Sequence, residues 1–154
     1  MFIEEWMTKT PRSVRPLDSV AHARALLEEH RINQMPVVTD GRLVGIVTDR
    51  DLRDASTVVK AATAEAGSIE AADATPDRIS VETVMTTNVL TLKPSDKLER
   101  AAELMRRERI GALPIVEKGR LCGILTRSDI LKAFVAMSGK AGGKPRRVST
   151  RKKP

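Results

Sequence analysis

Two threonine–aspartate pairs have the residue types and the spacing in this sequence that could do chemistry. Thr48 precedes Asp51 by three positions, and Thr126 precedes Asp129 by the same distance. A hydroxyl followed three residues later by a carboxylate has the form of a capping box, in which both side chains accept hydrogen bonds from free backbone amides at the start of a helix. The spacing alone therefore predicts two helix starts, and capping by itself is enough to account for it.

The two pairs belong to a longer internal repeat. Gly45–Asp51 reads GIVTDRD and Gly123–Asp129 reads GILTRSD, an offset of 78 residues. With this offset the copies align without a gap over about residues 3–55 and 81–133. Two copies are fewer than the roughly three that a solenoid needs, so the repeat predicts one pair of units about a pseudo-twofold axis.

Each copy predicts the same order of elements: strand, helix, strand, strand, helix. In the first copy, Pro16–Ser19 is typical of a helix start, and Asp40-Gly41 is a two-residue hairpin turn between two β-rich runs. Lys118-Gly119 is the equivalent turn in the second copy. We therefore expect an α/β (α+β) protein with unit 1 over residues 1–58, an Ala-rich linker over 59–80, unit 2 over 81–137 and a disordered basic tail over 138–154.

The net charge of +7 is concentrated at the C-terminus. Seven lysines and arginines and no acid follow Gly139, so residues 1–139 are neutral by count. A weak, salt-sensitive attraction of this tail to nucleic acid is an alternative function. The tail lacks interleaved aromatic residues for base stacking, which disfavours it.

Several other chemistries are excluded by the pattern. Asp49 and Asp51 do not predict a metal or acid–base site, because Asp49 is replaced by Arg127 in the second copy. The single Cys122 is expected to be a small buried hydrophobe, and the sequence has no catalytic triad, P-loop or zinc pattern. No apolar run approaches the ~18 residues of a membrane span, and no signal peptide begins the chain. We predict a cytoplasmic protein that is not an enzyme and requires no cofactor.

With these motifs in place, residues 3–137 resemble a tandem pair of cystathionine-beta-synthase (CBS) domains, also called a Bateman module. The resemblance rests on the two heptads of the form GhhTxxD, in which h is a hydrophobic residue and x is any residue. It also rests on the hairpin turns and on Pro36 with its equivalent Pro114. It implies two CBS units packed about a pseudo-twofold axis, with two clefts that take adenosine-containing ligands. AMP, ADP or ATP is the expected ligand, as in energy sensing, and the module is expected to form a homodimer and to signal to an unknown effector protein.

The resemblance also implies which residues bind. Thr48 and Asp51 in one cleft, and Thr126 and Asp129 in the other, would contact ribose and phosphate. The adenine pockets are expected from both units: Thr10, Gln34 and Met35 would complete the Thr126 and Asp129 site, and Asn88, Ala112 and Leu113 the Thr48 and Asp51 site.

The two sites are predicted to be unequal. Arg50 is replaced by Ser128 in the second copy, whereas Arg127 stands there in place of Asp49, so each helix start keeps one possible phosphate-binding arginine at a different position. Three further interpretations stay open: a sensor of S-adenosylmethionine or NAD(H), a structural dimerisation module without a ligand, and the weak nucleic-acid binder described above.

Overall fold

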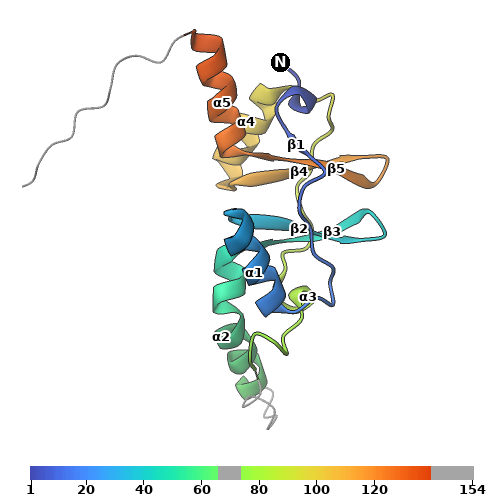
Figure 1. Ribbon diagram of the computed structural model, residues 1–154, viewed down its shortest axis with the longest axis vertical. Helices are drawn as coiled ribbons and strands as arrows, with labels where there is room; N and C mark the ends of the chain where they lie inside the picture. The colour runs from blue at the N-terminus through green and yellow to red at the C-terminus, as the bar shows by residue number, and fades with distance from the viewer. Residues whose placement is uncertain (66–73, 140–154) are drawn as a thin grey trace, which may run out of the picture.

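The structure is a computed structural model that describes residues 1–65 and 74–139. Figure 1 shows two stacked units, each with one β-hairpin and helices packed beside it. The elements of the first unit are α1 (Val20–His30), β2 (Gln34–Thr39), β3 (Arg42–Thr48) and α2 (Asp49–Glu65), and those of the second are α4 (Leu98–Glu108), β4 (Ala112–Glu117), β5 (Arg120–Thr126) and α5 (Arg127–Ser138). The shorter elements are η1 (Ile3–Glu5), β1 (Thr8–Lys9) and α3 (Val81–Val84).

The predicted mixed α/β fold is confirmed, and the hairpins form at the predicted turns. Asp40 and Gly41 have φ angles of 50° and 78°, and Lys118 and Gly119 have 50° and 79°. Two successive residues with positive φ match the right-handed twist of the flanking strands, and Gly at the second position adopts this conformation without a Cβ clash.

The two hairpins join in one antiparallel sheet of five strands. Its order is β1-β5-β3-β2, with β4 paired to β5, and Arg42 lies opposite Arg120 where β3 meets β5. The expected leading strand of each unit is reduced to a single parallel bridge, from Val14 to Val37 and from Leu92 to Ile115.

Both helices that follow a hairpin are longer than expected. α2 continues to Glu65, past the expected start of the linker at residue 59, and Val59 packs against the first core. α5 ends at Ser138, one residue past the expected end of the second unit at residue 137. The middle of the expected linker, residues 66–73, and nearly all of the expected tail, residues 140–154, lie outside the described residues.

The segment that begins each unit packs into the hydrophobic core of the other unit. Ile3 is fully buried in the core of the second unit, and Val81 is fully buried in the core of the first. The Ile3 amide donates to the Asp96 carbonyl at 3.0 Å, and the Val81 amide donates to the Asp18 carbonyl at 2.8 Å. In Figure 1 the N-terminal segment accordingly lies beside the second unit before the chain enters the first.

The two units meet along a boundary where β3 pairs with β5, which we call the seam. The same two segments pair with these strands beside the seam. Thr8 in β1 pairs antiparallel with Ile124 in β5, and Thr86 forms the equivalent bridge to Ile46 in β3. The repeat is therefore visible in three dimensions: each segment of the chain has a counterpart on the other side of the seam.

Candidate functional site

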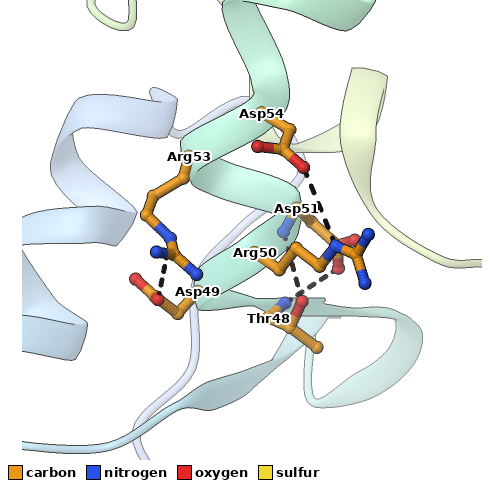
Figure 2. Close-up of polar contacts among 6 residues, drawn as sticks. All are labelled: Thr48, Asp49, Arg50, Asp51, Arg53 and Asp54. Carbon is orange, nitrogen blue, oxygen red and sulfur yellow. Dashed lines mark hydrogen bonds and ion pairs between the residues drawn. The ribbon is translucent and has the colours of Figure 1, made fainter.

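Each threonine–aspartate pair caps a helix, as predicted. The Thr48 amide donates to Asp51 Oδ2 at 2.9 Å, and the Asp51 amide donates to Thr48 Oγ1 at 3.2 Å (Figure 2). In the second unit the Thr126 amide donates to Asp129 Oδ2 at 2.9 Å. These bonds use amides that have no partner within the helix, so the capping function is real whether or not a ligand binds.

The second aspartate is held more firmly than the first. Asp129 is 5% exposed, and its carboxylate also accepts hydrogen bonds from Thr126 Oγ1 at 2.8 Å and from Lys132 Nζ at 3.2 Å. Asp51 is only partly buried. The hydrogen bonds and the lysine contact fix the orientation of the Asp129 carboxylate, whose oxygens can accept a ligand hydroxyl.

Two clefts open at the seam, one beside each cap. The first, which we call the Asp129 cleft, has a volume of about 370 Å³, and the second, the Thr48 cleft, about 330 Å³. Both lie within the usual range of small-molecule sites. The Asp129 cleft is lined by Thr8, Pro11, Arg12, Arg31, Ile32, Asn33, Gln34, Pro36, Ile124, Thr126, Ser128, Asp129 and Lys132. The Thr48 cleft is lined by Gln34, Ile46, Thr48, Thr86, Asn88, Val89, Leu90, Arg109, Ile110, Gly111 and Ala112.

The structure brings many of the predicted site residues together from opposite units. Gln34 of the first unit shares the Asp129 cleft with Thr126 and Asp129 of the second. Asn88 and Ala112 share the other cleft with Thr48. Their roles toward a ligand stay predictions.

Met35 and Leu113 are placed differently from their neighbours. Both side chains are fully buried in the two cores, because alternate residues of a strand point to opposite faces of the sheet. Neither residue lines either of the two clefts, so only the backbone of each could face a ligand, and their place in an adenine pocket stays a prediction. Asp51 lines no cleft in the free chain, although its cap partner Thr48 does.

The two predicted phosphate-binding arginines do not face either cleft. Arg50 is 85% exposed in its side chain and lies 3.8 Å from Asp54 one helical turn later, as Figure 2 shows. Arg127 Nε donates to the Ile110 carbonyl at 3.1 Å, and this side chain lines a shallow hollow beside α4 and α5. The spacing placed both residues correctly at a helix start, but local partners turn both guanidinium groups elsewhere.

Other cations line the clefts instead. Arg12, Arg31 and Lys132 line the Asp129 cleft, and Arg109 lines the Thr48 cleft. Arg31 and Arg109 are equivalent in the repeat, and both have left-handed backbone conformations where α1 and α4 end. Arginine occupies this position in both copies of the repeat, and that match could have pointed to both residues from the sequence alone.

A left-handed backbone position occurs at equivalent places in the two copies; Asn88 lines the Thr48 cleft, whereas Thr10, predicted for the other adenine pocket, is not among the residues that line the Asp129 cleft. Thr10 has a φ of 49°, and its repeat equivalent Asn88 has a φ of 54°. Asn tolerates this left-handed region, whereas a β-branched residue there is a genuine outlier.

We expect Thr10→Asn to raise the free energy of unfolding by about 0.5–1 kcal/mol, because it relieves this strain. Urea unfolding would measure the change, and the reverse substitution Asn88→Thr serves as the matched control with the opposite sign. An unchanged midpoint for both variants would show that the strain is absent.

Other reactive groups give no second site. Burial raises the pKa of the Cys122 thiol, whose Sγ lies 3.2 Å from the Ile115 carbonyl oxygen, in keeping with a packing role. Residues 1–65 and 74–139 contain no cluster of histidine, cysteine and acidic side chains that could hold a metal ion. Within the same residues no helix is both long and apolar enough to cross a membrane.

Together, the fold and the site define a duplicated α/β module with an equivalent cleft on each side of its seam. The family model of the CBS domain matches this chain twice, over residues 3–57 and 81–136. The chain therefore belongs to the CBS domain family and contains a tandem pair of these domains.

Relatives support this assignment over nearly the whole chain. The CBS domain-containing protein YhcV of Bacillus subtilis is 30% identical over 141 residues, which are 92% of this chain and 89% of that protein. An inosine-5'-monophosphate dehydrogenase of Korarchaeum cryptofilum is 34% identical over 82% of this chain but only 23% of its own length. The similarity to that enzyme is thus confined to a small part of it.

Two similar solved structures contain adenosine compounds. CBSX2 in complex with AMP has a TM-score of 0.74 and 29% identity, covering 90% of this chain and 98% of that one. The CBS domain pair of protein MJ0100, in complex with 5'-methylthioadenosine and S-adenosylmethionine, has a TM-score of 0.69 and 26% identity. That match covers 89% of this chain and 98% of the MJ0100 chain.

Proposed function

We propose that this chain is a non-catalytic regulatory module that binds an adenosine-containing ligand in its clefts and signals to a partner protein. The main support is the pair of equivalent clefts, each of which combines a capped helix start from one unit with loop and strand residues from the other. The positive end of the helix dipole favours a phosphate at such a position, and a carboxylate can accept ribose hydroxyls. The adenosine compounds in CBSX2 and MJ0100 support this class of ligand.

AMP, ADP or ATP is the proposed ligand, and S-adenosylmethionine or NAD(H) is the closest alternative. The energy-sensing role and the unknown effector protein belong to the same proposal, and the expected cytoplasmic location stays a prediction.

A second candidate function, a structural dimerisation module without a ligand, is favoured by one surface. The side chains of Leu131, Phe134, Val135 and Met137 on α5 are each more than half exposed. Apolar side chains grouped in this way are typical of interaction sites. A homodimer through this face is compatible with both functions.

Thermal unfolding of the full chain with AMP, ADP, ATP, S-adenosylmethionine and NADH would test the proposal. A ligand at about 100 times its Kd stabilises the folded state by about 2.7 kcal/mol, which is about 5–10 °C in Tm for a chain of this size. Asp129→Ala should reduce the ligand-induced shift from the Asp129 cleft, and Asp51→Ala should reduce the shift from the Thr48 cleft, because the Asp51 carboxylate accepts from the Thr48 amide there.

The loss of a cap also lowers the stability of the free chain, so each variant is compared with itself in the absence of ligand. Asp96→Ala is the matched control, because Asp96 accepts from the Lys93 amide at 2.8 Å and pairs with Arg100 but lines neither cleft. It should retain the full ligand-induced shift. If no compound shifts the wild-type Tm, the dimerisation function is favoured instead.

A further inference from the structure

The two clefts differ in charge although they are equivalent in the repeat. Three cations line the Asp129 cleft, whereas only Arg109 lines the Thr48 cleft. The difference comes from two positions. Arg12 is matched by Leu90 in the other copy, and Lys132 is matched by Asp54.

The local partners of these side chains increase the difference. No side-chain hydrogen bond or ion pair within the described residues involves Arg12, Arg31 or Arg109, so two uncompensated guanidinium groups line the Asp129 cleft and one lines the Thr48 cleft. Lys132 lies 3.2 Å from Asp129 and neutralises the one acid in the cleft wall. In the first unit the equivalent Asp54 pairs with Arg50 on the exposed side of α2 and supplies no cation.

The Thr48 cleft is apolar where the other is basic. Val89 and Leu90 form the part of its wall that corresponds to the Arg12 segment. Uncompensated guanidinium groups in a concave wall attract anions and can bind a phosphate through two hydrogen bonds, whereas an apolar wall accepts an uncharged group.

We infer that the two clefts divide adenosine ligands by charge. The Asp129 cleft binds the phosphorylated nucleoside through Arg12, Arg31 and Lys132, and the Thr48 cleft binds a nucleoside that carries no phosphate. This inference rests on the proposed function and deepens it, because it assigns a ligand class to each cleft.

Isothermal titration calorimetry of the full chain with AMP and with adenosine would test the division. Arg12→Leu introduces the residue found at the equivalent position and should weaken AMP by about tenfold or more, because a hydrogen bond to a charged group is lost. Adenosine affinity should not change. Leu90→Arg makes the reverse exchange and should add a second AMP site.

Arg15→Leu is the control, because it removes the same charge from an exposed side chain that lines neither cleft. It should leave AMP binding within about twofold of wild type. Arg12 is itself exposed, so the folded state is expected to survive its replacement, and an unchanged Tm without ligand would verify this.

The outcomes distinguish a failure of the division by charge from a failure of the proposed function. If AMP and adenosine both bind but Arg12→Leu leaves the ratio of their affinities unchanged, the division by charge is wrong and the proposed function stands. If wild type binds neither compound, nor any other member of the ligand panel, both are wrong.

Discussion

Replacing Ile3 with alanine is expected to lower the free energy of unfolding by about 2–5 kcal/mol, a large effect for a residue so close to a chain end. Ile3 has no exposed surface, and it packs in the second core with residues such as Leu98 and Leu113. The deletion removes buried methyl groups and leaves a cavity that close-packed neighbours fill only in part. Urea unfolding monitored by circular dichroism would measure the loss.

Phe2→Ala is the matched control for the same segment. Phe2 is 42% exposed and contacts Lys97, with Nζ 4.2 Å from the ring centroid. Its loss should cost about 1 kcal/mol or less, because an exposed cation–π contact contributes little. If Ile3→Ala is no more destabilising than Phe2→Ala, the N-terminal segment does not belong to the second core in solution.

Local features of the fold could be predicted because the sequence pattern for each of them occurs in both copies of the repeat. A hairpin turn such as Asp40-Gly41 depends only on the φ angles of two neighbouring residues, and a capping box depends on a spacing of three. Both are local in the chain, so the sequence pattern contains the whole cause. The family resemblance added the two clefts, each lined by residues from both units.

The exchange of core residues could not be predicted in the same way. Ile3 and Val81 are equivalent in the repeat, which predicts equal roles but does not tell which core each one enters. That choice appears only in long-range contacts, such as those of the Ile3 amide with the Asp96 carbonyl and of the Val81 amide with the Asp18 carbonyl. Contacts so distant in sequence leave no periodicity to detect.

The positions of the two arginine side chains could not be predicted for a different reason. Spacing located Arg50 at a helix start, but its side chain is 85% exposed and lies beside Asp54, one turn later, rather than in a cleft. Arg12, by contrast, lies before α1 in a segment with no periodic pattern, and only the fold brings it to the cleft.

Gly123→Ala is expected to cost about 1–3 kcal/mol, because the seam has no room for a side chain there. A Cβ at this position would lie 2.5 Å from Met7 Sδ and 3.0 Å from the Thr8 carbonyl oxygen. The methionine can move, but the carbonyl belongs to the backbone of β1, whose pairing with β5 would have to shift. Urea unfolding would measure the loss, with Gly111→Ala as the control.

The control has a different environment. A Cβ at Gly111 would approach only Gln34 Oε1, at 3.3 Å, and that atom is the end of a flexible side chain. Gly111→Ala should therefore stay within about 0.5 kcal/mol of wild type. Equal losses for the two variants would mean that any alanine is harmful at the seam, and the close approach at Gly123 would not be the cause.

The same substitution links the packing of the seam to the site. Thr8 and Ile124, which pair beside Gly123, also line the Asp129 cleft. A shift of β1 should move the Arg12 segment that follows it and weaken AMP binding in the Asp129 cleft, while the Thr48 cleft keeps its affinity for adenosine. A Gly123→Ala variant that is less stable but binds AMP as tightly as wild type would show that the seam holds the units together without setting the geometry of the cleft.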